Sequence, residues 1–214
     1  MGQGKQAKVL RPRELQRLLD HVSHTRHPAR DRVMVLLSFK SGLRAKEIAG
    51  LTWSMVTDAT GELADAISLP NRASKGKNGG RTIPLHNDLR AALASLTAVR
   101  GEKVRSHLPV VYSERAAGYS ANAIAVWFLT RFREIGIEGA SSHSGRSTFI
   151  TAATKKITEA GGSLRDIQEL VGHSSLATTY SGRYRRKAER HHVNRKSSVH
   201  AAAVDLPQSS RAGF

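Results

Sequence analysis

The segment SGLRAKEI, residues 41–48, stands between two apolar stretches and decides how the chain around it folds. The apolar run at residues 33–39 precedes it, and we interpret that run as a helix. Gly42 suits the end of the helix, because glycine readily takes the left-handed conformation found just after helices. Apolar residues farther along predict a short second helix, with Arg44 near its start.

The regions on either side of this segment have mainly helical patterns. Upstream, apolar side chains recur at positions i, i+3, i+4 and i+7, as expected for a helix with one buried face. These side chains are Leu15, Leu18, Leu19 and Val22. Downstream, helical patterns cover residues 87–98, 120–135, 143–160 and 163–171. Breaks that contain glycine or serine separate them, so several helices of ordinary length are expected.

Residues 64–85 lack the helical pattern of the regions on either side. Residues 64–70 and 81–85 are short extended stretches, and they flank the basic segment SKGKNGG at residues 74–80. Two such stretches around an Asn-Gly centre predict a β-hairpin. Lys75 and Lys77 are expected at the tip of this hairpin.

The composition excludes several classes of protein. The 34 Lys and Arg residues against 17 Asp and Glu residues give a formal net charge of +17. No cysteine is present, so a disulfide framework, a thiolate nucleophile and a Cys-ligated zinc site are excluded. No apolar run approaches the roughly 20 residues that a membrane span needs, and no membrane partner is expected. We expect a cytoplasmic protein whose partner is a polyanion.

The charge also outlines the domain organisation. Residues 1–8 are polar and are expected to be flexible, residues 9–190 are expected to form one domain, and residues 191–214 a basic, disordered tail. Residues 183–196 alone contain seven Lys and Arg residues and one Glu. Charged arms of this kind often bind nucleic acid.

Basic and nucleophilic side chains recur where the local pattern breaks. They are Arg44, Lys75, Lys77, His143, Arg146, His173, Tyr180 and Tyr184. Arginine forks match phosphate oxygens, and histidine can move protons near neutral pH. A lysine can protonate a leaving oxygen, and a tyrosine hydroxyl can attack phosphorus. If they converge, these groups suffice for phosphoryl transfer without a metal or another cofactor.

The order of these residues resembles the catalytic domain of the tyrosine recombinases, the phage integrase family. The matching segments are SGLRAKEI at 41–48, GRTIPL at 80–85, SHSGRSTF at 142–149 and LRDIQELVGHSS at 164–175. The resemblance implies an α+β, mainly helical fold with a small antiparallel hairpin sheet. It also implies site-specific recombination of double-stranded DNA through a 3′-phosphotyrosyl intermediate, performed by a homo-tetramer without metal or ATP.

The resemblance further implies a role for each residue that matches the family pattern. Arg44 and Arg146 would hold the scissile phosphate, and Glu47 would support that site without reacting. Lys75 would protonate the leaving 5′-oxygen, with Lys77 as the alternative lysine. His143 would assist proton transfer, and His173 would hydrogen-bond a phosphate oxygen.

The tyrosine nucleophile departs from the family spacing. The family usually places it nine residues after the histidine that corresponds to His173, and position 182 is a glycine here. Tyr180 and Tyr184 lie seven and eleven residues after His173. Because the family often has Arg-Tyr at the nucleophile, Tyr184 is favoured and Tyr180 is the alternative.

Two alternatives to a complete recombinase remain open. Family members commonly carry a separate helical DNA-binding domain before the catalytic one, whereas only about eight residues precede the first helix here. Together with the shifted tyrosine, this allows a DNA-binding remnant with impaired chemistry. With either function, we expect the cytoplasmic protein to be associated with the nucleoid. A metal-dependent nuclease is a more distant alternative, because paired carboxylates do not accompany the basic segments.

Overall fold

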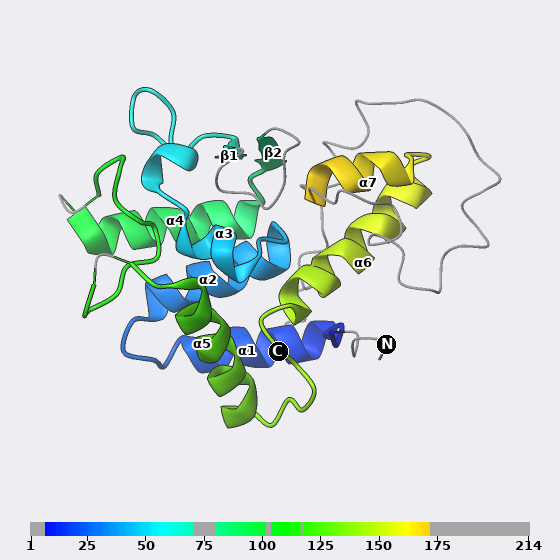
Figure 1. The fold of residues 1–214 in the computed structure, drawn as a ribbon, viewed down its shortest axis with the longest axis horizontal. Helices are drawn as coiled ribbons and strands as arrows, with labels where there is room; N and C mark the ends of the chain where they lie inside the picture. The colour runs from blue at the N-terminus through cyan, green and yellow to red at the C-terminus, as the bar shows by residue number, and fades with distance from the viewer. Residues whose placement is uncertain (1–6, 71–79, 102–103, 117, 172–214) are drawn as a thin grey trace, which may run out of the picture.

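The structure is a computed structural model that describes residues 7–70, 80–101, 104–116 and 118–171. Its elements in chain order are α1 (Pro12–Val22), α2 (Pro28–Lys40), α3 (Ala45–Ala49), the 3₁₀ turn η1 (Trp53–Met55), β1 (Ala66–Leu69), β2 (Arg81–Pro84), α4 (Asn87–Arg100), α5 (Ala121–Glu134), α6 (Ser144–Glu159) and α7 (Leu164–Val171). Figure 1 shows this mainly helical arrangement, and β1 and β2 pair with each other as the one sheet found among the described residues. The predicted α+β architecture is confirmed.

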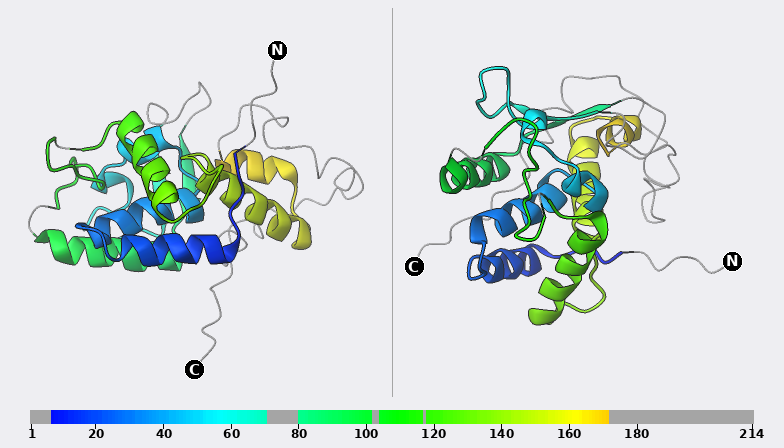
Figure 2. Two further views of the ribbon diagram at one scale, coloured as in Figure 1. Left: turned by 90° about the horizontal axis from the view of Figure 1, so that it is seen from below. Right: turned by 60° about the vertical axis from the view of Figure 1, so that its left-hand side comes forward.

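Helix α2 forms the centre of the fold. It packs against α1, α3, α4 and α6, and the two further views in Figure 2 show helices on several of its sides. Every side chain from 33 to 39 is buried, because a helix surrounded by neighbours is apolar around most of its circumference. This explains why the sequence shows a continuous apolar run here instead of a stripe.

Helix α1 has the one-sided pattern that was predicted. Leu18 and Val22 are fully buried, and Leu15 and Leu19 pack against the edge of the core. Pro12 begins the helix, where its missing N–H removes no intrahelical hydrogen bond. The four downstream helical predictions correspond to α4, α5, α6 and α7, each with bounds within two residues of the prediction.

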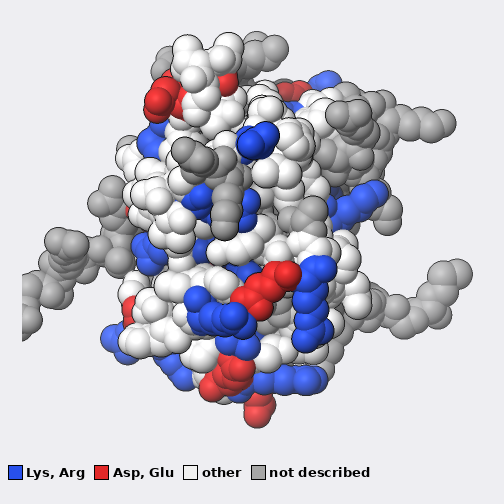
Figure 3. Space-filling view, turned by 90° about the vertical axis from the view of Figure 1, so that its left-hand side faces the viewer, with Lys and Arg blue, Asp and Glu red and all other residues white. Residues whose placement is uncertain are grey.

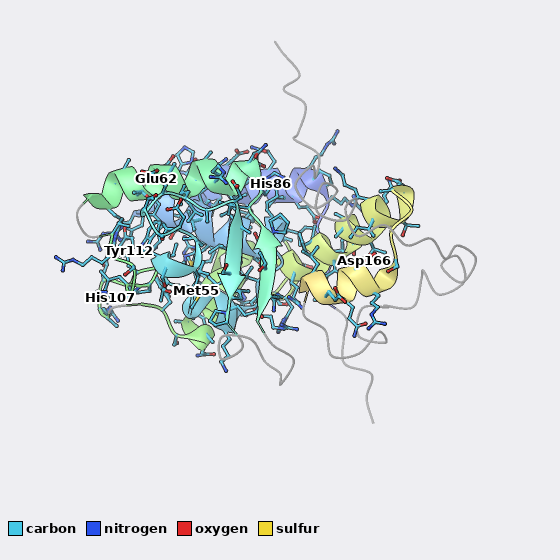
Figure 4. All side chains as sticks on the ribbon, turned by 90° about the horizontal axis from the view of Figure 1, so that it is seen from above. Met55, Glu62, His86, His107, Tyr112 and Asp166 are labelled. Atoms are coloured by element: carbon cyan, nitrogen blue, oxygen red, sulfur yellow. The ribbon has the colours of Figure 1, made fainter. Side chains whose placement is uncertain are left out.

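The two strands form the predicted antiparallel pair. Ile67 lies opposite Ile83 and both are buried, whereas Ser68 lies opposite Thr82 and both are exposed. Helix α7 contacts β2 and also packs against α6. Figure 4 looks onto the strands and shows α4, which follows β2 through His86, on one side, and α7, which carries Asp166, on the other. The predicted hairpin tip with Lys75 and Lys77 lies within residues 71–79, which are outside the described residues.

Candidate active site

The turn between α2 and α3 positions Arg44. Gly42 has φ +62°, in the left-handed region that favours glycine, and the Leu43 amide donates a 3.1 Å hydrogen bond to the Leu37 carbonyl. A Cβ atom at Gly42 would lie 2.5 Å from a ring carbon of Phe149 in α6. Both the backbone conformation and the available space therefore require glycine at this position. Arg44 follows directly and is the N-cap residue of α3.

Helix α6 crosses α2 at a second glycine. A Cβ atom at Gly145 would lie 2.1 Å from Ser38 Oγ and 2.9 Å from a ring carbon of Phe39. This close approach places the next residue, Arg146, against the end of α2. Its side chain is buried, and it donates a hydrogen bond to the carbonyl oxygen of Gly42. Two of the predicted site residues, which are 102 positions apart, thus meet at one turn.

Glu47 lies at the centre of this group and is buried, with 1% of its surface exposed. Its Oε2 accepts hydrogen bonds from the Arg44 amide (2.7 Å) and from Arg81 Nη2 (3.0 Å). Its Oε1 accepts from Arg44 Nη1 (3.0 Å) and Arg81 Nη1 (2.9 Å). A carboxylate has about four acceptor positions, so every one of them is occupied.

Arg81 is the residue that sequence reasoning missed. It begins β2, pairs in register with Leu69, and forms a two-pronged contact with Glu47. The sequence offered one signal, a single basic residue that opens the strand segment GRTIPL. Nothing in the local pattern identifies its partner, because Glu47 is 34 positions earlier.

The electrostatics of the site favour an anion. Burial opposes ionisation of Glu47, but the hydrogen bonds and charges of Arg81 and Arg44 outweigh it and hold the pKa of Glu47 below its ordinary 4.5. Burial lowers the pKa of Arg146 to about 9, and repulsion from Arg44 and Arg81 adds to that effect. Arg44 and Arg81 are ion-paired with Glu47, and Arg146 lies within the electrostatic influence of all three, so three guanidinium groups and one carboxylate leave a net charge of +2.

His143 lies at the start of α6, three residues before Arg146. It is exposed and is the N-cap residue of the helix, and its amide donates to Ser141 Oγ (3.3 Å). Ser144 Oγ accepts from the Ser141 amide (3.0 Å), which closes the turn that leads into α6. His143 is therefore available to solvent beside the buried Arg146.

The remaining predicted site residues lie outside the described residues. These are Lys75, Lys77, His173, Tyr180 and Tyr184. Two described elements lead toward them in sequence, since β2 begins at Arg81 and α7 ends at Val171. Strand β2 and helix α7 contact each other, and the ion pair between Arg81 and Glu47 connects β2 to α3.

Other features of the described residues bear on the function. Within residues 7–70, 80–101, 104–116 and 118–171, no cluster of three or more His, Asp or Glu side chains could hold a metal ion. In the same part of the chain, no helix is both long and apolar enough to span a membrane. Figure 3 shows Lys and Arg side chains scattered over one face of the molecule, with Asp and Glu side chains among them on its lower part and at its upper edge.

Several curated proteins are similar in sequence. Tyrosine recombinase XerC of Actinobacillus pleuropneumoniae serotype 7 is 31% identical over 167 residues, which cover 78% of this chain and 51% of the relative. Tyrosine recombinase XerA of Thermococcus kodakarensis is 30% identical over 174 residues, covering 80% of this chain and 56% of the relative. The chain thus spans just over half the length of these two relatives.

Solved structures show the same fold. The crystal structure of XerA recombinase superposes with a TM-score of 0.63 at 23% identity, over 83% of this chain and 60% of that one. The Tn1549 transposon integrase in complex with transposon right end DNA gives 0.62 at 17% identity, over 84% and 62%. The sequence profile described as "Phage integrase family" matches residues 8–191. Because that match covers most of the chain, this protein belongs to the phage integrase family.

Proposed function

We propose that this chain carries the catalytic domain of a site-specific DNA recombinase, which cleaves and rejoins strands through a 3′-phosphotyrosyl intermediate. The single observation that carries the proposal is the convergence of Arg44 and Arg146 beside the buried Glu47. Arg44 at the N-cap of α3 and Arg146 in α6 come from distant parts of the chain, and together they form a preorganised cationic site. Such a site stabilises the charge on a phosphodiester as it passes through its transition state.

In the cleavage step, the hydroxyl oxygen of Tyr184 attacks the scissile phosphorus, with Tyr180 as the alternative nucleophile. The bond between phosphorus and the 5′-oxygen breaks, and a phosphotyrosyl bond to the 3′ side forms. The tyrosine proton passes toward His143, and Lys75, or alternatively Lys77, gives a proton to the 5′-oxygen. Arg44, Arg146 and His173 hold the non-bridging phosphate oxygens.

Rejoining is the reverse of cleavage. The 5′-hydroxyl of a partner strand attacks the phosphotyrosyl phosphorus, the tyrosine leaves and recovers its proton, and a phosphodiester forms. One phosphoester bond forms and one breaks in each step, so neither ATP nor a metal is needed to balance the reaction. The cationic group around Glu47 supplies the charge stabilisation that Mg²⁺ supplies in other phosphoryl-transfer enzymes.

The partner in this proposal is double-stranded DNA, bound by a homo-tetramer in the cytoplasm at the nucleoid. The net charge of +17 supports a polyanionic partner. Among proteins of similar structure, the XerH site-specific recombinase was solved bound to its difH substrate, and the Tn1549 integrase with transposon DNA. We assign residues 9–190 to the catalytic domain and residues 191–214 to a basic tail that increases the affinity for DNA.

A second candidate is a DNA-binding protein whose chemistry is impaired. The observation that favours it is the tyrosine spacing, seven or eleven residues after His173 where nine is usual for the family. Such a protein would keep strongly salt-dependent DNA binding, with a slope of about −0.9 per neutralised phosphate. It would form no covalent species, which separates the two candidates.

The experiment that tests the proposal has two stages. Duplexes that the full chain binds are first selected from a fragment library of the source genome. A selected site is then made as a nicked suicide duplex, so that cleavage releases a short fragment and the covalent adduct accumulates on a denaturing gel. An adduct with the wild-type chain supports the recombinase. Specific binding with no adduct overturns the enzymatic claim and favours the second candidate.

Two single substitutions identify the nucleophile in the same assay. Tyr184→Phe removes one hydroxyl oxygen and should abolish the adduct, whereas Tyr180→Phe, the matched control, should leave it. The opposite result would assign the nucleophile to Tyr180. An adduct that still forms when Tyr180→Phe and Tyr184→Phe are combined in one chain would exclude both tyrosines and overturn this part of the mechanism.

A further inference from the structure

The contact between Arg81 and Glu47 is the most buried charged pair that joins two elements of the site. The side chain of Arg81 is 8% exposed and that of Glu47 is 1% exposed. Arg81 presents both terminal nitrogens to Glu47, at 2.9 and 3.0 Å, while its Nε is buried with no hydrogen-bond partner among the described residues. A buried N–H without a partner is costly, so the pairing with Glu47 dominates the orientation of this side chain.

Arg81 restricts the orientation of Glu47. A carboxylate held by a single hydrogen bond can rotate, whereas a parallel two-pronged contact with a guanidinium fixes its plane. The same two oxygens of Glu47 also accept the amide and Nη1 of Arg44. The orientation of the Arg44 side chain, a quarter of which is exposed, therefore depends on a residue from the hairpin.

Arg81 also sets the charge that Arg44 can offer. If Glu47 had Arg44 as its only charged partner, the pair would be close to neutral. Because Arg81 shares the carboxylate, the group of Arg44, Arg81 and Glu47 retains a net charge of +1. A positive charge next to the buried Arg146 favours an anion over solvent at this site.

We propose that Arg81 is a positioning residue, which acts through Glu47 to orient Arg44 and to tie β2 to the arginine pair. The inference rests on the proposed function and goes beyond it, because it assigns a role to a side chain outside the set of predicted site residues. β2 begins at Arg81, and the candidate lysines Lys75 and Lys77 precede it by six and four residues. Helix α7, which leads to His173 in sequence, contacts the same strand.

The experiment compares four full-length variants with the wild type, namely Arg81→Met, Glu47→Gln, the double variant, and Arg30→Met as a matched control. Arg30 forms a buried pair with Asp31 at 2.7 Å near the start of α2, whereas the site lies beyond the end of that helix. The measurements are the adduct rate at saturating nicked duplex, the duplex Kd and the thermal midpoint. A fourth measurement is the ¹⁵Nε–¹Hε NMR signal of Arg44, assigned by its loss in Arg44→Lys.

Arg81→Met should slow adduct formation about 10- to 100-fold, because a small misplacement of a positioning group is costly. The duplex Kd should stay within about twofold, since Arg81 is one of 34 Lys and Arg residues that can attract phosphates and its side chain is mostly buried. The Arg44 signal should shift, because its carboxylate partner is no longer fixed. Arg30→Met should lower the thermal midpoint and leave both the adduct rate and the Arg44 signal unchanged.

The double variant separates positioning from stability. Arg81 and Glu47 contact each other directly, so the loss of thermal midpoint in the double variant should be smaller than the sum of the losses in the two single variants. The adduct rate should nevertheless remain low, because Arg44 has lost its anchor. A wild-type adduct rate in the double variant would overturn the positioning role, as would an unchanged Arg44 signal in Arg81→Met.

The NMR signal keeps the two proposals distinguishable. If the wild type forms no adduct on a site that it binds, the recombinase proposal fails. The response of the Arg44 signal to Arg81→Met still decides whether Arg81 orients Arg44. If the wild type forms the adduct and Arg81→Met matches its rate while folded, the Arg81 proposal fails and the recombinase proposal stands.

Discussion

Arg146 donates a guanidinium hydrogen bond to the carbonyl oxygen of Gly42, so the first turn of α6 is held by the turn that precedes Arg44. This contact joins residues that are 104 positions apart. It exists because glycine at 42 and glycine at 145 allow α6 to approach the end of α2 closely. The arrangement of the two arginines is therefore a result of backbone packing as much as of their own side chains.

Replacing Arg146 with methionine should separate function from stability. Burial lowers the pKa of Arg146 to about 9, so at neutral pH the folded chain bears the cost of a buried charge. We expect Arg146→Met to slow adduct formation about 10²- to 10³-fold and to leave the thermal midpoint unchanged or raised. Gel assays of the adduct and thermal unfolding check this.

The sign of the pH dependence is fixed by the same pKa. Because the pKa of Arg146 in the folded chain is below its ordinary value, burying the charged guanidinium destabilises the fold. This destabilisation is fully present below about pH 9 and declines as the pH rises above it. Any gain in midpoint from Arg146→Met should therefore shrink above pH 9. A gain that grows with pH would contradict this account, and Arg146→Lys provides a control that keeps a charge.

Gly42→Ala should destabilise the fold and disturb the site. The new methyl group would meet the Phe149 ring, and alanine at φ +62° costs roughly 1–2 kcal/mol by conformation alone. We expect a total loss of about 2–4 kcal/mol in the free energy of unfolding, measured by urea denaturation. The adduct rate should fall as well, since Gly42 contacts Arg146.

Gly136→Ala is the matched control for that prediction. Gly136 has φ +66°, and no atom lies within 4 Å of the place that a methyl group would take, so this substitution should show the conformational cost alone. Adding Phe149→Leu to Gly42→Ala should restore part of the loss by making room. Equal losses in Gly42→Ala and Gly136→Ala would show that the contact with Phe149 is unimportant.

Glu47→Gln should make the free energy of unfolding less dependent on pH in the acidic range. The folded pKa of Glu47 lies below 4.5, so its contribution to stability is present above pH 4.5 and is lost as the pH falls through the folded pKa. Removing one partner of a buried ion pair costs about 3–5 kcal/mol at neutral pH. The difference between wild type and variant should narrow below pH 4.5 in acid titrations of unfolding. A difference in the free energy of unfolding that stays constant below pH 4.5 would contradict this role of Glu47.

The two candidate lysines can be separated by the chemistry of the leaving group. A 5′-thiolate leaves without needing a proton, because thiols are far more acidic than alcohols. Lys75→Ala should abolish cleavage of an ordinary nicked duplex and recover with a 5′-thio substrate, both measured as adduct. Lys77→Ala serves as the control and should cleave the ordinary substrate. The reverse pattern would assign proton transfer to Lys77.

Local sequence patterns were sufficient for most of the fold. The period of apolar residues in α1, the glycine stop after α2 and the strand pattern around Ile67 and Ile83 act over a few residues. Such signals depend on the backbone geometry of one element, so they can be read without knowing its neighbours. The order of the motifs along the chain also indicates the family.

The partners of the charged side chains were decided only by the tertiary structure. Glu47 was expected to support the site, but its pairing with Arg81 depends on how the hairpin packs against α3. The burial of Arg146 likewise depends on the crossing of α6 over α2. Contacts between residues far apart in the chain determine which charged side chains pair and what net charge the group carries. No local sequence pattern encodes such contacts.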